Sequence, residues 1–391
     1  MITQRYSFNR RCNCNVNLKA FRMQAVCRAL RTAAAVALAG MLAACAGPPS
    51  VPAQKPLRAT TPAIAAKPDI ELACRMLKAS YCAYDVSTRT FDSATRSAKM
   101  ERCETRTELQ LPPQLALVAS PRPDVYLTPG GTNAFAVMQT QRDEIIISFR
   151  GTIGLGAGLL GYLDWLNNFQ SSRISDELLG NVHFGFHNAL FGGAVGDSMW
   201  ESLWRIMLRL RAENTLAGKK IYITGHSKGG ALAVLAAARL KKEFGITASA
   251  VYTFESPRAG TVDFAQRYAE LGIPTFRFES RGDIVPHLPP ENDETPILAA
   301  LGLPAVTVSW WDPYVAIGRL GFIDWDGTLR FPEETAEFNT RRSREFVDNL
   351  LSTDPRGILS EDLRGKLQFN HRVLPGGPSY FDVLCGGRAA P

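Results

Sequence analysis

The sequence predicts an α/β fold with a mostly parallel central sheet and helices on both of its faces. Two observations carry this prediction. Apolar runs of β type alternate with helical stretches, and the stretch over 228–244 is apolar on nearly every side, as a helix buried against a sheet must be. The chain has 391 residues, 46% of them hydrophobic and 21% charged. This composition supports a large core and excludes collagen-like, coiled-coil and mainly disordered proteins.

The first 44 residues account for the whole net charge of +7. They hold seven basic residues and no acidic ones, whereas residues 45–391 hold 37 of each sign. A neutral body has no overall field that attracts phosphates, so we expect no nucleic-acid partner. The apolar run over 33–44 is too short to span a bilayer and follows Arg28 and Arg31, which is typical of a secretory signal peptide.

The apolar run ends in Leu42-Ala43-Ala44-Cys45, which resembles the lipobox of bacterial lipoproteins. The resemblance implies that residues 1–44 are a lipoprotein signal peptide and that Cys45 becomes the lipidated first residue, anchoring the protein to a membrane. Ala46 in the next position implies the outer membrane in bacteria that have two. An ordinary signal peptide with a chance cysteine is the alternative, and Met23 is a second candidate start.

Residues 45–68 are rich in Pro and Ala and have no apolar period, so they are expected to form a semi-extended tether. The folded domain is expected over 69–391. Its first element is predicted as a helix over 70–84 with Asp69 as the N-cap.

Four cysteines fall in the expected domain, and in an exported protein they predict two disulfides, with four buried thiols as the alternative. Cys74 and Cys82 lie about 12 Å apart along one helix, which is too far to bond to each other. Cys385 is therefore expected to pair with one of them, and Cys103 with the other.

The body of the domain shows the predicted alternation of elements. Strands are expected over 133–139, 145–149, 220–224, 250–254 and 275–279. Helices are expected near 184–212, 228–244 and 262–271. A hairpin is expected to turn at Asp326-Gly327.

One motif carries chemistry. The run Gly225-His226-Ser227-Lys228-Gly229 is a G-x-S-x-G pattern between a predicted strand and a predicted helix. In this context it predicts a tight, strained turn that raises Ser227 above the sheet as a nucleophile, with the flanking glycines leaving room for strand and helix to pack closely. The helix N-terminus beside the serine favours developing negative charge.

A serine nucleophile needs a base, and the base needs an orienting carboxylate. Asp283 follows the last predicted strand, where an acid would face the pocket. Only His287 and His371 come after Ser227, as the order Ser, acid, His requires. His287 is only four residues from Asp283, so His371 is the predicted base and His287 a structural neighbour. His226 is expected to pack in the turn.

Four blocks make the sequence similar to the class 3, fungal-type triacylglycerol lipases. In chain order they are Phe149-Arg150-Gly151-Thr152, the G-x-S-x-G block extended by Gly230-Ala231-Leu232-Ala233, Thr253-Phe254-Glu255-Ser256-Pro257-Arg258, and Asp283-Ile284-Val285-Pro286-His287-Leu288-Pro289-Pro290. The resemblance covers residues 130–290 and resumes at His371 and Tyr380.

This resemblance implies an α/β-hydrolase fold with Ser227 as nucleophile, Asp283 as acid and His371 as base. It also implies an oxyanion hole made by the backbone N–H groups of Thr152 and Lys228, with the Thr152 hydroxyl helping. No metal or organic cofactor is implied.

The departures from the family pattern raise further expectations. Glu255 stands where Gly is usual, and Lys228 replaces an apolar residue, with a solvated side chain favoured over an ammonium group near the site. The apolar segment 296–311 is expected to be a core element or, alternatively, a flap that contacts substrate. The Gly-rich, apolar segment 153–163 is expected to be a mobile cover that opens at a lipid surface, with a permanently packed loop as the alternative.

The sequence therefore predicts an exported, lipid-anchored serine hydrolase that cleaves carboxylic esters of lipids through an acyl-enzyme. A phospholipase or a short-chain carboxylesterase on the same scaffold is the nearest alternative. A non-catalytic, lipid-binding lipoprotein is the alternative of another class.

Overall fold

The computed structural model describes residues 67–85, 103, 116–124, 131–152, 173–192, 198–289, 312–324, 326–353 and 380–386. Several expectations lie outside these residues: the signal peptide, Cys45 and the tether, the cover over 153–163, the apolar segment 296–311, and His371. Within the described ranges, no helix combines the length and the apolar character needed to cross a membrane.

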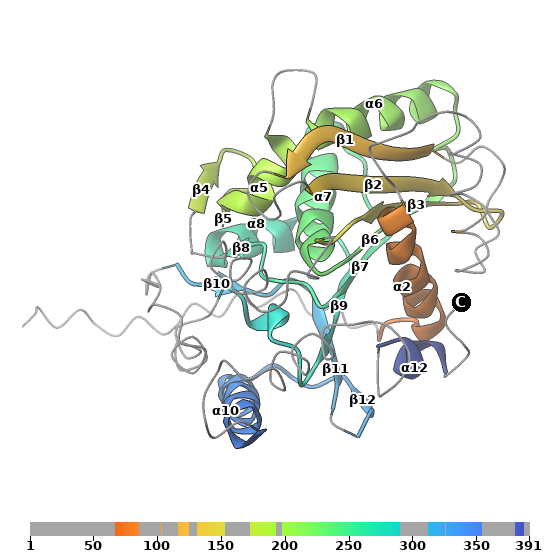
Figure 1. Cartoon of the computed structure of the whole chain (residues 1–391). Helices are drawn as coiled ribbons and strands as arrows, with labels where there is room; N and C mark the ends of the chain where they lie inside the picture. The colour runs from red at the N-terminus through yellow and green to blue at the C-terminus, as the bar shows by residue number, and fades with distance from the viewer. Residues whose placement is uncertain are drawn as a thin grey trace, which may run out of the picture. The chain divides into compact units, whose positions relative to one another are not determined.

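An eight-stranded sheet forms the centre of the domain (Figure 1). Its strands, in spatial order, are β1 (Ala116–Asp124), β2 (Gly131–Gln139), β3 (Glu144–Phe149), β6 (Lys220–His226), β7 (Ala250–Phe254), β9 (Thr275–Ser280), β11 (Arg319–Ile323) and β12 (Leu329–Arg330). The five strands from β3 to β11 are mutually parallel, and the strands at both edges are antiparallel. All five predicted strands are present, and β11 and β12 form the predicted hairpin around Asp326-Gly327.

Successive side chains of the parallel strands point to opposite faces of the sheet, so each strand contributes residues to a hydrophobic core on both faces. In β3, Ile145 and Ile147 join one hydrophobic cluster, whereas Ile146 joins the other. In β6, Ile223 and Tyr222 divide in the same way. The first cluster includes residues of α7 (Lys228–Phe244), α5 (Phe184–Phe191), α6 (Met199–Ala212) and α8 (Val262–Glu270), and the second includes residues of α2 (Ile70–Asp85) and α12 (Tyr380–Cys385). Helices thus cover both faces, and the predicted α/β fold with a mostly parallel central sheet is confirmed.

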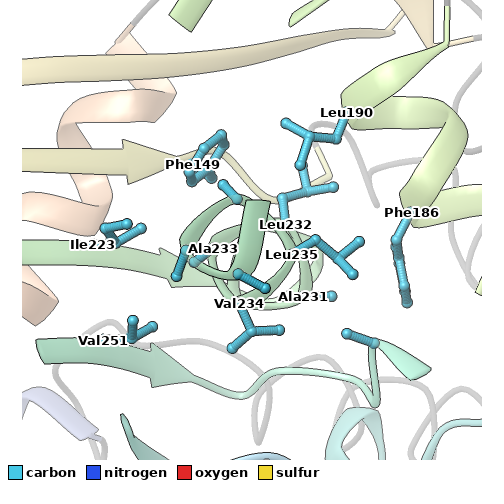
Figure 2. Close-up of a cluster of buried hydrophobic side chains, with 14 of the residues drawn as sticks. Phe149, Phe186, Leu190, Ile223, Ala231, Leu232, Ala233, Val234, Leu235 and Val251 are labelled. Carbon is cyan, nitrogen blue, oxygen red and sulfur yellow. The ribbon is translucent and has the colours of Figure 1, made fainter. Parts of the chain in front are cut away.

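Helix α7 has the predicted bounds and the predicted burial. Every residue from Lys228 to Ala238 is buried, together with Leu240. Figure 2 shows this helix end-on, with Ile223 and Val251 of the sheet on one side and Phe186 and Leu190 of α5 on the other. A helix packed between a sheet and another helix has no face left for water, which explains its nearly continuous apolar sequence.

The sequence predicted one helical region near 184–212, but the structure has two helices there. Helix α5 ends with Gly192 as its C-cap. Helix α6 starts at a capping box, in which the Ser198 side chain accepts from the Glu201 N–H and the Glu201 carboxylate accepts from the Ser198 N–H. The C-cap at Gly192 and the N-cap at Ser198 thus separate the two helices, although the apolar pattern of the sequence continues on both sides.

A second, antiparallel sheet was not predicted. Its strands are β10 (Tyr314–Val315), β8 (Gly260–Thr261), β5 (Gly180–His183) and β4 (Arg173–Asp176). Strands of two to four residues are too short to show a period of two in the sequence. The remaining described elements are the 3₁₀ helix η2 (Val285–His287) and the helix α10 (Ala336–Thr353).

The expectation of two disulfides is confirmed, and the structure selects one of the two pairings that the sequence left open. Cys385 bonds to Cys74, and Cys82 bonds to Cys103, each with 5.1 Å between the Cα atoms. The first bond joins α12 to α2, which lie side by side in Figure 1. Asp69 is the N-cap of α2 as expected, since its carboxylate accepts from the Leu72 N–H at 3.0 Å.

Replacing the two disulfides in turn is expected to have unequal effects on the free energy of unfolding. The Cys74–Cys385 bond closes a loop of 311 residues, and the Cys82–Cys103 bond closes one of 21. On the chain-entropy model the Cys74→Ser/Cys385→Ser variant loses about 5–6 kcal/mol, and Cys82→Ser/Cys103→Ser about 3 kcal/mol. Urea unfolding of the two matched double variants measures both losses, and a reversed order would contradict this prediction.

Candidate active site

The candidate residues meet at one edge of the sheet because the strands that precede them are parallel. Phe149 of β3 pairs with Gly225 of β6, which pairs with Thr253 of β7. The loops that leave the carboxyl ends of these strands therefore start side by side. They carry Thr152 and Ser227, and the adjacent strand β9 brings Asp283 to the same edge.

The backbone at Ser227 has the predicted strain. Its φ of 56° and ψ of −133° lie in a region that L-residues rarely adopt, at a cost of about 1–3 kcal/mol. Hydrogen bonds hold the turn: the Ser227 N–H donates to the Phe254 carbonyl at 2.9 Å, and the Ser227 carbonyl accepts from the Gly230 N–H at 2.8 Å. The Ser227 side chain precedes α7 but does not cap it. At an ordinary serine N-cap the hydroxyl accepts a hydrogen bond from a backbone N–H of the first helical turn, and the Ser227 hydroxyl does not make this bond.

The flanking glycines let strand and helix approach as closely as predicted. A Cβ added to Gly225 would lie 2.2 Å from the carbonyl carbon of Gly229, and one added to Gly229 would lie 2.1 Å from the carbonyl oxygen of Phe149. Both contacts are with backbone, which cannot move aside cheaply. The turn therefore requires glycine at both positions.

The residues expected to bind an oxyanion lie next to the serine. A Cβ on Gly151 would be 3.1 Å from the Ser227 Cβ, so the loop that carries Thr152 passes directly beside the turn. Lys228 is the first residue of α7, where backbone N–H groups have no partner within the helix. The favoured expectation of a solvated Lys228 side chain is wrong, because this residue is only 2% exposed.

Asp283 is fully buried in the loop that follows β9. One carboxylate oxygen accepts from the Val285 N–H at 3.0 Å, and the Asp283 N–H donates to the Ser280 carbonyl at 3.1 Å. These bonds fix the carboxylate at the start of η2. A buried carboxylate in a fixed orientation suits a residue that must orient a base.

Arg258 braces the loop that carries Asp283. Its guanidinium Nη1 donates to the carbonyls of His287 at 3.1 Å and Pro289 at 2.8 Å, and its backbone N–H donates to the Leu288 carbonyl at 2.7 Å. The side chain is buried, at 3% exposure. The arginine of the T-F-x-x-P-R block therefore has a structural role that the sequence pattern did not reveal.

The Arg258→Met variant is expected to lose about 2–4 kcal/mol of the free energy of unfolding, because two buried carbonyls lose their donor. The matched control is Arg267→Met, which removes a half-exposed i,i+4 ion pair with Asp263 on α8. This change is expected to cost less than about 0.5 kcal/mol. Equal losses in urea unfolding would show that the two carbonyls do not depend on Arg258.

Each of the four histidines that the structure describes makes contacts with groups other than the Ser227 hydroxyl. The His183 Nδ1 accepts from the Gly185 N–H at 3.1 Å, and His187 pairs with Asp176 at 2.9 Å. The His287 ring is buried against Phe346, with 5.1 Å between centroids, as a structural neighbour would be.

The His226 ring is engaged at both of its nitrogens. Nδ1 lies 2.8 Å from the Tyr84 hydroxyl, and Nε2 lies 2.8 Å from the Glu255 carboxylate. The ring thus packs in the turn as predicted, and it cannot accept a proton from Ser227 without breaking one of these contacts. His371, which lies outside the described residues, stays the predicted base.

Burial makes His183 sensitive to acid. Burial lowers the pKa of His183 to about 3 from an ordinary value of 6.5. The imidazole of His183 therefore binds a proton more readily in the unfolded chain than in the folded protein. The contribution of His183 to the free energy of unfolding is complete above pH 6.5 and is lost progressively as the pH falls towards 3.

The His183→Asn variant keeps a cap acceptor for α5 but does not titrate. Between pH 6 and 4 the free energy of unfolding of this variant is expected to fall less steeply than that of wild type. The two slopes are expected to differ by up to about 1.4 kcal/mol per pH unit. Urea unfolding of both proteins across this range measures the slopes. Identical slopes would mean that His183 does not contribute to acid sensitivity.

Three residues near the site, of which Glu255 and Tyr380 are buried and Tyr84 is partly buried, make contacts that were not predicted from the sequence. Tyr84 comes from α2, Glu255 from the turn after β7, and Tyr380 from α12. The Tyr380 hydroxyl accepts a hydrogen bond from the Ser280 N–H, and burial, with the nearby carboxylates of Glu255 and Asp283, raises its pKa well above the usual range. In the sequence, Glu255 was visible as a departure from the family pattern and Tyr380 as part of the resemblance, whereas no signal pointed to Tyr84.

Comparisons with known proteins agree with this geometry over the central part of the chain. A family model described as lipase (class 3) matches residues 146–293, which include Ser227 and Asp283. A lipase of Rhizomucor miehei is 46% identical over 164 residues, covering 41% of each chain.

Two further relatives differ in their named substrates. A secreted mono- and diacylglycerol lipase of Fusarium solani is 32% identical over 167 residues, covering 42% of this chain and 44% of the relative. The phospholipase A1 EG1 of Oryza sativa subsp. indica is 30% identical over 168 residues, covering 38% and 36%. The chain thus matches less than half of the length of these curated relatives.

Proposed function

We propose that the protein is a serine hydrolase that cleaves carboxylic esters of lipids. The observation that carries the proposal is the strained turn at Ser227, which lies between a parallel strand and a buried helix and leaves the hydroxyl out of the helix cap. Strain of this kind persists where the surrounding structure enforces it, and here it serves to present a nucleophile.

In the proposed reaction, the Ser227 Oγ attacks the ester carbonyl while His371 takes the hydroxyl proton. Asp283 holds the imidazolium that forms, and the N–H groups of Thr152 and Lys228 bind the oxyanion of the tetrahedral intermediate. The intermediate collapses by breaking the bond to the alcohol, which leaves with the proton from His371. Water then attacks the acyl-enzyme by the same steps, with His371 now taking the proton from water.

Lipid esters are the proposed substrates because the model that matches residues 146–293 describes lipases, and because the relatives include a lipase and a secreted mono- and diacylglycerol lipase. The rice relative named a phospholipase A1 supports a second candidate, hydrolysis of phospholipid acyl esters on the same scaffold. Both reactions use one nucleophile and differ in the alcohol that leaves. Rates on a triacylglycerol emulsion and on phospholipid vesicles, measured with one preparation, distinguish the two candidates.

We also propose that the protein is exported and anchored by a lipid on Cys45, at the outer membrane. The secretory pattern of residues 1–44 and the lipobox-like ending support this location. The two disulfides favour an oxidising compartment. Metabolic labelling with a palmitate analogue tests the anchor, and a Cys45→Ser variant that labels equally would contradict it.

The Ser227→Ala variant is expected to lose ester hydrolysis by about 10³-fold or more while keeping the wild-type melting temperature, because only the hydroxyl is removed. His371→Ala is expected to match it, since the two residues act as a unit. Initial rates on a nitrophenyl ester measure both. A variant of Ser227 that kept a tenth of the activity would disprove the nucleophile.

The control for the base is His287→Ala, which is expected to cost much less activity than His371→Ala. If His287→Ala is inactive and His371→Ala is active, the base is misassigned. Labelling of Ser227 by a fluorophosphonate separates the proposed enzyme from a non-catalytic lipid-binding protein, which would not react.

A further inference from the structure

Three side chains from separate parts of the chain, of which Glu255 is fully buried and Tyr84 and His226 are partly buried, form one line of hydrogen bonds next to the Ser227 turn. The Tyr84 hydroxyl is 2.8 Å from the His226 Nδ1, and the His226 Nε2 is 2.8 Å from a Glu255 carboxylate oxygen. At the other end, the Gly151 backbone N–H bonds to the Tyr84 hydroxyl. The line therefore runs from the loop that carries Thr152 to the loop after β7, and it passes through the residue before the nucleophile.

The direction of each hydrogen bond follows from its neighbours. Burial and the Glu255 carboxylate raise the pKa of Tyr84, so its hydroxyl keeps its proton. The hydroxyl oxygen accepts from the Gly151 N–H, and its proton points to the His226 Nδ1. The imidazole then carries its own proton on Nε2, which donates to Glu255.

Glu255 has a backbone conformation that is unfavourable for a glutamate. Its φ of 52° lies in the left-handed region, where glycine, the usual residue of the resembled family, is unstrained. Its side chain is fully buried. A strained backbone and a buried carboxylate both oppose folding, so the contact with His226 must supply something that glycine does not.

The line ends where an oxyanion would be bound. A Cβ on Gly151 would lie 2.2 Å from the Tyr84 hydroxyl oxygen and 2.7 Å from the His226 carbonyl oxygen, so this loop is in close contact with both residues. The next residue is Thr152. A shift of the Tyr84 hydroxyl or of the His226 ring would therefore move the loop relative to Ser227.

We propose that Glu255, His226 and Tyr84 are positioning residues that hold the Gly151–Thr152 loop at the distance from Ser227 that the oxyanion of the tetrahedral intermediate requires. This inference rests on the proposed serine hydrolase function. It assigns a role to the glutamate at the family's glycine position, and it connects α2 to the reaction without any contact with substrate.

The test compares Tyr84→Phe and Glu255→Gly, which break the line, with Glu255→Gln, which keeps an acceptor for the His226 Nε2–H. The matched control is Tyr268→Phe on α8, which removes a buried hydroxyl 2.8 Å from the hydroxyl of Thr275, the first residue of β9 and thus at the end of that strand opposite the candidate site. For each folded variant, kcat and KM are measured on a soluble nitrophenyl ester, together with the inhibition constant of an alkyl trifluoromethyl ketone. This ketone adds to the serine as a tetrahedral mimic and depends on the oxyanion site.

Tyr84→Phe and Glu255→Gly are each expected to lower kcat about 10-fold and to weaken the ketone by a similar factor, with KM within about twofold, because displaced donors affect the tetrahedral state more than the bound ester. Glu255→Gln is expected to stay within about threefold of wild type in kcat and ketone binding. Tyr268→Phe is expected to change only the melting temperature.

A fall in melting temperature with unchanged kcat and ketone binding in both line-breaking variants would overturn the positioning role. If Tyr84→Phe does not fold, the comparison of Glu255→Gly with Glu255→Gln decides, and equal values for these two would also overturn it. Failure of the proposed function is distinguishable, because wild type would then fail to react with a fluorophosphonate at Ser227. A labelled, active wild type with unaffected variants rejects the positioning role alone.

Discussion

The backbone conformation of Ser227 is the constraint on which the rest of the site depends. A φ of 56° is unfavourable for serine, and it is maintained because β6 and α7 leave no other path between them. Gly225 and Gly229 touch backbone atoms so closely that a methyl group would not fit at either position. The burial of α7 against the parallel strands, worth about 25 cal/mol per Å² of apolar surface, is the favourable contribution that offsets this strain.

The parallel arrangement of the sheet converts that local turn into a site. Because β3, β6, β7 and β9 end at one edge, residues spread over more than a hundred positions of sequence arrive next to one another. Buried side chains at this edge connect one segment of the chain to another. Arg258 after β7 holds the loop after β9, and Tyr380 of α12 bonds to the end of β9.

Helix α2 connects the covalent frame of the domain to the site. Its cysteines bond to Cys103 and to Cys385, and its last turn carries Tyr84. A helix fixed at two points by disulfides is a rigid support for a hydroxyl that contacts the Ser227 turn. This arrangement gives a physical reason for a disulfide framework in a domain that already has a large core.

The sequence by itself determined the elements whose signals are local. The periods of the strands, the continuous apolar run of α7, the G-x-S-x-G turn and the Asp69 cap are each encoded within a few residues, and the structure has all of them. The disulfide partners were narrowed to two pairings by helix geometry alone. The break between α5 and α6 was also encoded locally, at Gly192 and Ser198, but the apolar period on either side masked it.

Only the tertiary structure decided which distant side chains meet. Tyr84 and His226 are separated by 142 positions, and no local pattern states that they share a hydrogen bond. The burial of Lys228 was equally invisible, because lysine is ordinarily exposed and only the packing of α7 determines otherwise. Contacts of this kind depend on the relative placement of whole elements, which is set by the summed burial of the core and not by the residues that happen to touch.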